Sequence, residues 1–340
     1  MTFRIALGFE DGVTRFIDCK PSESVADAAY RAGINIPLDC RDGACGTCKS
    51  VCESGRFDPG QPLDEALSPE EAAEGYVLTC QMKPQSDCVV RIAAASAACK
   101  VRPAATGATL TAVEALSPTT LRFELAPDGG ADLAFLPGQY ANIGVPGTAE
   151  TRAYSFASLS RNGRVDFVVR NIPGGLMSGW LASSAKAGDR MTLTGPFGSF
   201  YLRPLVRPAL MLAGGTGLAP FIAMLERLLE TGFTHPVRLV CGVTGPADLV
   251  LTERLADIAA RAPAFSFITV VADAASGHPR TGYVTQHLED ADFHGGDVDI
   301  YLCGPPPMVD AVRADLHRRA ITPASFHTEK FAPGTEAKAA

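Results

Sequence analysis

The sequence has no excess of basic residues. Its 340 residues include 30 Lys and Arg against 37 Asp and Glu, which gives a formal net charge of −7. Because nucleic-acid binding depends on neutralising phosphates with basic side chains, this balance argues against a nucleic-acid partner. The acidic excess lies mainly in the first hundred residues. It either steers docking onto a basic partner or simply keeps that surface solvated.

Long apolar runs are also scarce. Residues 208–225 carry no charge, and their length is near the lower limit for a membrane-spanning helix. However, Gly214, Gly215, Gly217 and Pro220 interrupt this stretch. A buried strand, a loop and a helix of an α/β domain explain it better, so we expect no membrane span.

The first residues show no basic segment followed by an apolar one, as a secretory signal would. The ten cysteines are therefore not expected to form a disulfide framework, and we expect a cytoplasmic protein. Six of them follow no recognisable spacing and are expected to be free thiols: Cys19, Cys52, Cys88, Cys99, Cys241 and Cys303. The six His residues have no metal-ligand spacing either.

Four other cysteines do follow a pattern. Cys40, Cys45 and Cys48 have the spacing C-x4-C-x2-C, and Cys80 follows at a distance. This is the plant-type 2Fe–2S spacing, in which one loop supplies three thiolates and a distant strand supplies the fourth. A structural zinc usually requires two short pairs of ligands, and here the second half offers only Cys80. Zinc and a disulfide pair remain as alternatives.

The residues between these cysteines fit a cluster loop. Gly43 and Gly46 let the backbone fold closely around the sulfurs, so that the amides of residues 41–47 can point at them. An iron–sulfur centre exchanges single electrons and cannot itself accept a hydride. The rest of the chain is therefore expected to supply a group that splits an electron pair.

The chain divides into regions with different patterns. The first has alternating strands, a turn at Asp11 and Gly12, a helix between Ser24 and Gly33, and a short helix after Ser68. It resembles the β-grasp fold of plant-type ferredoxins. Short alternating segments near 121–125, 165–169 and 191–194 then indicate an antiparallel barrel. Buried strands near 209–213, 237–243, 266–271 and 298–303 indicate a parallel α/β sheet.

The predicted fold is therefore multidomain, α+β and α/β. The predicted regions are a 2Fe–2S ferredoxin domain (1–95), a linker (96–106), an FAD-binding barrel (107–206), an NAD-binding domain (207–334) and a disordered tail (335–340).

The barrel carries a flavin motif. Arg152, Tyr154 and Ser155 match R-x-Y-S/T of the ferredoxin–NADP reductase superfamily, and segments 136–140 and 174–178 also resemble that superfamily. Arg can bind a pyrophosphate, Tyr can stack on a flat ring, and Ser can hydrogen-bond near the flavin N5. The resemblance implies an FAD site formed by Arg152, Tyr154, Ser155, Val169, Arg170, Gly174, Gly175, Met177 and Ser178.

The α/β region opens with a glycine-rich loop. It departs from G-x-G-x-x-G because Pro220 occupies the position of the third glycine, but it matches the superfamily's own G-G-T-G-x-A/T-P. The resemblance implies that backbone amides here meet the NAD pyrophosphate. The implied residues are Gly214, Gly215, Thr216, Gly217 and Pro220.

A later strand ends in Cys303, Gly304 and Pro305, a segment that lies beside the nicotinamide in this superfamily. Without the motif, Cys303 is simply a small buried residue. Phe331 resembles the aromatic residue that covers the flavin. The resemblance thus implies Ser155, Cys303 and Phe331 as the catalytic residues. NADH is favoured over NADPH because no Lys or Arg follows the second strand before Arg254, and Asp248 can accept a ribose hydroxyl.

The order of these modules resembles the reductases of class IB two-component aromatic-ring dioxygenases, particularly those of the benzoate type. This resemblance implies that FAD takes a hydride from NADH and passes electrons singly through the 2Fe–2S cluster to the Rieske centre of a separate oxygenase. It also implies docking near the loop from Cys40 to Cys48, and we expect a monomer. A reductase for a di-iron hydroxylase shares all three modules and is the main alternative. A redox sensor would need an output domain, which is not recognisable here.

Overall fold

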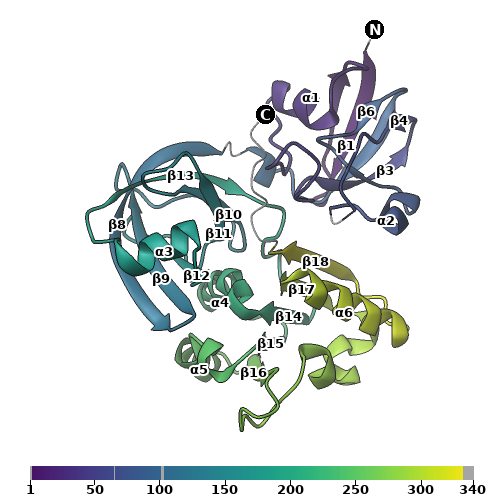
Figure 1. The fold of residues 1–340 in the computed structure, drawn as a ribbon. Coiled ribbons are helices and arrows are strands. Elements are labelled where there is room, and N and C mark those ends of the chain that lie inside the picture. Colours follow the sequence, from purple (N-terminus) through teal and green to yellow (C-terminus); the bar gives the residue numbers. More distant parts are fainter. Residues whose placement is uncertain (1, 65, 101–102, 332–340) are drawn as a thin grey trace. The chain divides into compact units, whose positions relative to one another are not determined.

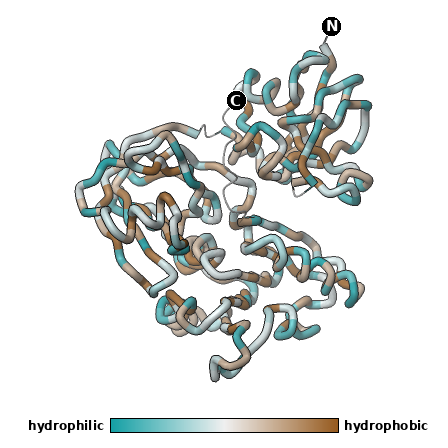
Figure 2. The backbone as a smooth tube through the Cα atoms, in the orientation of Figure 1, coloured by the Kyte–Doolittle hydropathy of each residue, from teal (hydrophilic) through white to brown (hydrophobic). Residues whose placement is uncertain are grey.

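The computed structural model describes residues 2–64, 66–100 and 103–331 (Figure 1). The chain divides into two compact units. The first contains Met1–Ala104 and Gly195–Ser199, and the second contains Ala105–Thr194 and Phe200–Ala340. Within each unit, much of the interior chain is hydrophobic, whereas hydrophilic segments lie mostly along the outer turns (Figure 2). No described helix is both long enough and apolar enough to cross a membrane.

The first unit is built on a mixed five-stranded sheet in the order β2-β1-β7-β3-β5, with β4 and β6 pairing separately. Alternate residues of β1, such as Ile5 and Leu7, are fully buried, so one face of the sheet forms the core. The strands are β1 (Phe3–Phe9), β2 (Thr14–Cys19), β3 (Lys49–Ser54), β4 (Phe57–Asp58), β5 (Tyr76–Leu78), β6 (Lys83–Pro84) and β7 (Cys88–Ile92).

The predicted local signals of this unit are confirmed. Gly12 has a φ of 76° in the turn between β1 and β2. Helix α1 (Val25–Arg31) begins after Ser24, whose hydroxyl accepts a hydrogen bond from the Asp27 amide at 3.1 Å. Helix α2 (Pro69–Ala73) begins after Ser68, which forms a capping box with Glu71. A 3₁₀ helix, η1 (Ala98–Lys100), lies near the end of the unit.

The second unit begins with an antiparallel sheet in the order β11-β10-β13-β8-β9-β12. A bridge between Phe156 and Phe167 connects its two edges, so the sheet closes into the predicted barrel. Phe123 stacks on Phe167 in the core at 5.2 Å between ring centroids. The elements are β8 (Ala104–Ser117), β9 (Thr120–Pro127), β10 (Tyr140–Gly144), β11 (Thr151–Ser155), β12 (Val165–Arg170), β13 (Arg190–Phe197) and helix α3 (Leu176–Ser183).

A parallel sheet in the order β16-β15-β14-β17-β18 completes the second unit. One face packs against α4 and α5, and the other packs against α6. Its strands are β14 (Ala209–Gly214), β15 (Val237–Val243), β16 (Phe265–Val271), β17 (Asp299–Gly304) and β18 (Ser325–Lys330). Its helices are η2 (Gly215–Leu218), α4 (Ala219–Thr231), η3 (Pro246–Asp248), α5 (Thr252–Arg261), η4 (Val284–His287), η5 (Asp290–Gly296) and α6 (Pro306–Arg318).

Two features differ from the sequence-based expectation. The predicted linker, 96–106, includes η1 and the first residues of β8 rather than only irregular chain. Strand β18 was not predicted, because its sequence SFHTEK is polar and its residues are mostly half-buried at the edge of the sheet. The predicted tail, 335–340, lies outside the described residues.

The sheet order reverses direction between β14 and β17, where open α/β sheets bind ligands. Here the loops that follow the two strands touch. A methyl group on Gly217 would overlap the carbonyl oxygen of Cys303, and one on Gly214 would lie 2.8 Å from Pro305. Glycine is therefore required for the close approach of these two loops.

The substitution Gly217→Ala is expected to lower the free energy of unfolding by about 1–3 kcal/mol, because the added methyl group forces the two loops apart. Gly179→Ala in α3 is the matched control, since a methyl group there meets nothing within 4 Å. It should be neutral or stabilising by about 0.5–1 kcal/mol. Denaturant unfolding measures both. Equal effects of the two variants would contradict the steric argument.

Candidate functional site

The four predicted cluster ligands lie at one place in the first unit. Three belong to the loop between α1 and β3, and the fourth lies two residues after the end of β5. Arg41, Gly43 and Gly46 have positive φ angles of 65°, 85° and 73°, which wrap this loop tightly. All four thiols are free of disulfides: Cys40, Cys45, Cys48 and Cys80.

The thiols lie in two pairs. A hydrogen bond from the Cys40 thiol lowers the pKa of Cys45 to about 6, and a hydrogen bond from the Cys48 thiol likewise lowers the pKa of Cys80. The amide of Cys45 donates to the Cys40 sulfur at 3.4 Å, and the amide of Gly43 donates to Cys80. In the described chain, no three His, Cys, Asp or Glu side chains gather closely enough for a single metal ion. Two thiol pairs with amide donors fit a two-iron cluster better than one zinc.

The flavin motif lies on β11. Arg152 and Tyr154 are two residues apart in this strand, so their side chains share a face, and Ser155 lies on the other face. Arg152 is half-buried and pairs with Glu150 at 3.1 Å. Tyr154 packs edge-on against Phe123 with ring centroids 5.9 Å apart, and burial raises the pKa of its hydroxyl. One charged group and one aromatic ring on the same face can hold a phosphate and a flat ring.

The predicted phosphate turn precedes α3. Gly174 has a φ of 74°, and Gly175 is the N-cap of the helix. The Ser178 hydroxyl is occupied by the turn itself, since it accepts from the Ile172 amide at 3.1 Å and donates to the Ile172 carbonyl at 3.2 Å. This contact shapes the turn and leaves the first amides of the helix as the anion-binding groups.

Two predicted flavin residues have side chains that point into the barrel core. Val169 and Met177 are 5% and 2% exposed and belong to the same apolar cluster. Arg170, by contrast, is exposed at the end of β12. Only the main chain of Val169 and Met177 is therefore available to a ligand, and their assignment to the flavin site stays a prediction.

The glycine-rich loop lies at the carboxyl end of β14. Gly215 has a φ of 57°, and no atom lies within 4 Å of the position of a side chain there. Thr216 and Gly217 belong to η2, and Pro220 lies in the first turn of α4, as predicted. This half-buried, glycine-rich backbone before a helix N-terminus fits a pyrophosphate.

The predicted catalytic residues meet where the barrel contacts the parallel sheet. The buried hydroxyl of Ser155 donates to Glu329 at 3.0 Å, and the Cys303 thiol lies 3.9 Å from the same oxygen. Burial raises the pKa of Glu329 to about 8 and raises that of Cys303 as well. Phe331 donates its amide to the Gly304 carbonyl at 3.0 Å, beside this group. Burial therefore favours the neutral, protonated form of both groups.

Glu329 was not among the predicted site residues. It was noted only as part of the segment that ends at Phe331, and the sequence does not reveal that β18 buries this carboxyl against Ser155. The only signal in the sequence was that Glu329 lies two residues before Phe331, which was predicted to be catalytic.

Asp248 has a different environment from the one expected. One carboxylate oxygen accepts from the Thr119 hydroxyl at 2.6 Å, and the other accepts from the Gly245 amide at 2.9 Å. The Asp248 side chain thus caps the N-terminus of η3 and also contacts the barrel through Thr119. A ribose hydroxyl would have to bind carboxylate oxygens that already accept these two hydrogen bonds. The predicted contact between Asp248 and the ribose stays a prediction.

Three family profiles match the chain in succession. They are the 2Fe-2S iron-sulfur cluster binding domain over residues 9–85, the oxidoreductase FAD-binding domain over residues 107–201, and the oxidoreductase NAD-binding domain over residues 211–314. The cofactors implied by the sequence are therefore confirmed at the level of domains. The matched ranges lie within the predicted domains, whose limits stay predictions.

Known proteins align with nearly the whole chain. The toluate 1,2-dioxygenase electron transfer component of Pseudomonas putida is 55% identical, with 98% of this chain and 99% of the relative covered. The 2-halobenzoate 1,2-dioxygenase electron transfer component of Burkholderia cepacia is 51% identical, with the same coverage. The propane 2-monooxygenase reductase component of Mycolicibacterium smegmatis is 33% identical, with 92% of each covered.

Among solved structures, an Amycolatopsis cytochrome P450 reductase superposes with a TM-score of 0.71 at 36% identity. The alignment covers 98% of this chain and all of the other. The order of domains and the fold predicted from the sequence are thus those of a known group of oxidoreductases.

Stability should show the pH dependence of the Glu329 carboxyl. Its pKa is raised from 4.5 to about 8 on folding, so the folded protein keeps a proton that the unfolded chain loses between these values. This group's contribution to stability therefore falls as pH rises from about 4.5 to 8. Glu329→Gln has no proton to lose. Its melting temperature minus that of the wild type should increase from pH 5 to pH 9, and a constant difference would contradict the raised pKa.

Proposed function

Because this chain belongs to the family of electron transfer components of aromatic-ring dioxygenases, the class IB reductases, we propose that it takes electrons from NADH and delivers them singly to a Rieske-type dioxygenase. The observation that carries the proposal is that one chain contains two kinds of site. Ser155, Glu329 and Cys303 form a largely buried group beside the glycine-rich loop, and a separate unit gathers four thiols.

When bound, FAD would supply the chemistry that accepts a hydride from NADH and releases the two electrons singly to an iron–sulfur cluster. The protein's residues position these groups. The loop from Gly214 to Gly217 and the first turn of α4 hold the pyrophosphate, while Arg152 and α3 hold the flavin phosphates. Ser155 and Glu329 hold a proton inside the junction, where a buried charge would be unfavourable.

The preference for NADH follows from the chain after β15. No Lys or Arg is present between Val243 and Arg254. The Arg254 guanidinium is already paired with Glu226. A 2′-phosphate would therefore find no basic partner in this segment, whereas the hydroxyl of NADH needs none.

The docking surface for the oxygenase is proposed at the cluster loop. Cys45 is exposed there, and the nearby Leu63 is 50% exposed while its amide bonds to the Gly43 carbonyl at 3.1 Å. An apolar side chain beside the ligand loop, with acidic residues such as Asp64 around it, can contact a basic partner. The reductase is proposed to act as a monomer.

The partner oxygenase is proposed to act on a benzoate-like aromatic acid, because the names of both relatives above 50% identity include a substituted benzoate. A reductase for a di-iron hydroxylase is less favoured, since the propane monooxygenase relative is only 33% identical. Reconstitution with each type of oxygenase discriminates between them: only the correct partner should show product formation dependent on this chain.

Removing one cluster ligand should stop electron transfer through the iron–sulfur cluster without stopping the reduction of the flavin by NADH. Cys80→Ala is expected to lose the cluster absorbance, while NADH still bleaches the flavin and ferricyanide is still reduced. Transfer to cytochrome c should fall by roughly tenfold or more, because the one-electron outlet is missing. Cys52→Ala, in β3, is the control and should retain the cluster. If Cys80→Ala kept the full rate to cytochrome c, electrons would not pass through this site.

Reversing a charge beside the cluster loop should weaken docking. Asp64→Lys is expected to lower the rate constant for electron delivery to the oxygenase by about tenfold at low salt and by less at high salt, because the attraction is screened. Reduction of ferricyanide by NADH should not change. Glu253→Lys in α5 is the matched control. If both substitutions lowered this rate constant equally, the acidic residues near the cluster loop would have no specific role in docking and would serve only solubility.

A further inference from the structure

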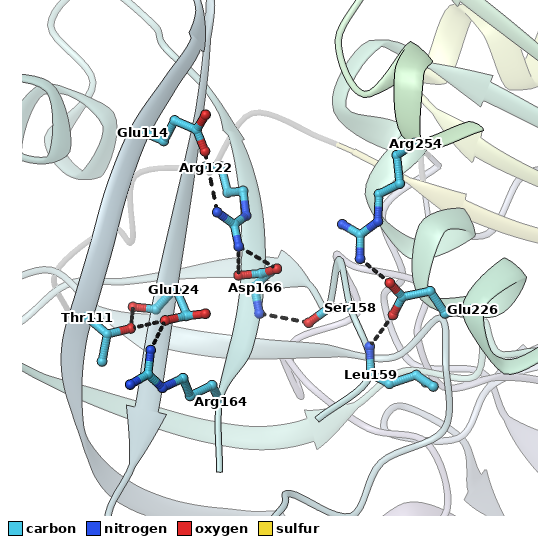
Figure 3. Close-up of polar contacts among 10 residues, drawn as sticks. All are labelled: Thr111, Glu114, Arg122, Glu124, Ser158, Leu159, Arg164, Asp166, Glu226 and Arg254. Carbon is cyan, nitrogen blue, oxygen red and sulfur yellow. Dashed lines mark hydrogen bonds and ion pairs between the residues drawn. The ribbon is translucent and has the colours of Figure 1, made fainter. Parts of the chain in front are cut away.

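Besides the contact between Ser155 and Glu329, a polar contact at Glu226 joins the barrel to the parallel sheet domain. Glu226 on α4 accepts a hydrogen bond from the Leu159 amide at 2.9 Å, and its other oxygen binds Arg254 on α5 (Figure 3). The Glu226 side chain is only 14% exposed, and Leu159 is buried. One carboxylate therefore connects the main chain of the barrel to two helices of the sheet domain.

The two connected segments carry the expected ligand groups. Leu159 follows Ser155 by four residues, just beyond the strand with the flavin motif. Helix α4 begins directly after the glycine-rich loop that is expected to hold the NAD pyrophosphate. Any shift of α4 against this part of the barrel would therefore move the two cofactors relative to each other.

A second contact on the same helix makes its direction well defined. Ala219, in the first turn of α4, packs with Ala157 and Val168 of the barrel in a small apolar cluster. Glu226 lies two helical turns later, roughly 10 Å along the axis at 1.5 Å per residue. Two separated contacts fix the angle of the helix. Elsewhere, the hydrogen bond from Thr119 to Asp248 of η3, at 2.6 Å, also holds the sheet domain to the barrel.

One further charged pair crosses the groove. Arg161 of the barrel binds Glu230 of α4 at 2.8 Å, but both side chains are exposed, and exposed ion pairs contribute little to stability.

Two other charged pairs line the groove but lie within the barrel. The groove has a volume of about 520 Å³. Arg122 pairs with Asp166, and Arg164 pairs with Glu124, all within the barrel (Figure 3). Glu124, with a side chain 19% exposed, resembles Glu226 in burial but makes these contacts within one domain.

We propose that Glu226 is a positioning residue: through the Leu159 amide it clamps α4 to the barrel and so sets the distance between nicotinamide and flavin for hydride transfer. The inference rests on the proposed function. The bond to the main chain is the important one, because losing it leaves a buried N–H without an acceptor. The Arg254 side chain is 30% exposed, and partly solvated ion pairs contribute little.

The test uses the full chain with its flavin and cluster, and three variants: Glu226→Ala, Glu226→Gln and Glu124→Ala. The first readout is amide hydrogen exchange over residues 156–161, which does not depend on turnover. Glu226→Ala should speed exchange at Leu159. Glu226→Gln should not, since the amide oxygen of Gln can still accept this bond. Glu124→Ala should leave Leu159 protected.

The second readout is single-turnover reduction of the flavin by NADH. At saturating NADH, Glu226→Ala should be slower by roughly 10- to 100-fold, because small displacements of reacting groups have large effects on rate. The dissociation constant for NADH should change little. Glu226→Gln and Glu124→Ala should both stay close to the wild-type rate.

Each contrary result has a definite meaning. A wild-type rate in Glu226→Ala despite faster exchange at Leu159 would overturn the positioning role. An equally slow Glu226→Gln would overturn the importance of the main-chain bond. An equally slow Glu124→Ala would reduce the effect to general loss of stability. If NADH failed to reduce the flavin of the wild type, the proposed function would fail, while the exchange result would still decide whether Glu226 clamps Leu159.

Discussion

The hydrogen bond from Ser155 to Glu329 joins the flavin strand of the barrel to the edge of the parallel sheet. Burial raises the pKa of the Glu329 carboxyl to about 8, which favours its neutral form and so limits the cost of placing an acid in this junction. Cys303 and Phe331 are arranged beside it by β17 and β18. A hydride site between two domains depends on such a contact, because each domain supplies only part of it.

The folds of the two units suit different tasks. A parallel sheet whose strand order reverses at its centre offers glycine-rich backbone for a dinucleotide, and a closed barrel offers a rigid strand for a flat ring. A tightly wrapped loop with three positive φ angles instead surrounds four sulfurs with amide donors. The parallel sheet and the barrel thus suit cofactors that exchange two electrons together, whereas the cysteine loop suits a cluster that exchanges single electrons.

Much of this could be predicted from the sequence. The spacing of Cys40, Cys45 and Cys48, the flavin motif and the glycine-rich loop each reflect a local backbone requirement, so that they are visible without a structure. The strands of the α/β sheet were predicted where they are apolar. Strand β18 was missed because its residues are polar, and Glu329 was missed with it. The partners of Asp248 and the contact from Glu226 to Leu159 connect residues far apart in the chain, which no local pattern reveals.

The central claim is that NADH reduces the iron–sulfur centre through the flavin of the same chain. Anaerobic titration of the purified protein with NADH, followed by visible absorbance and electron paramagnetic resonance, tests it directly. The account predicts bleaching of the flavin together with the signal of a reduced 2Fe–2S centre after about one to two equivalents. If NADH left the iron oxidised while dithionite reduced it, the account would be contradicted.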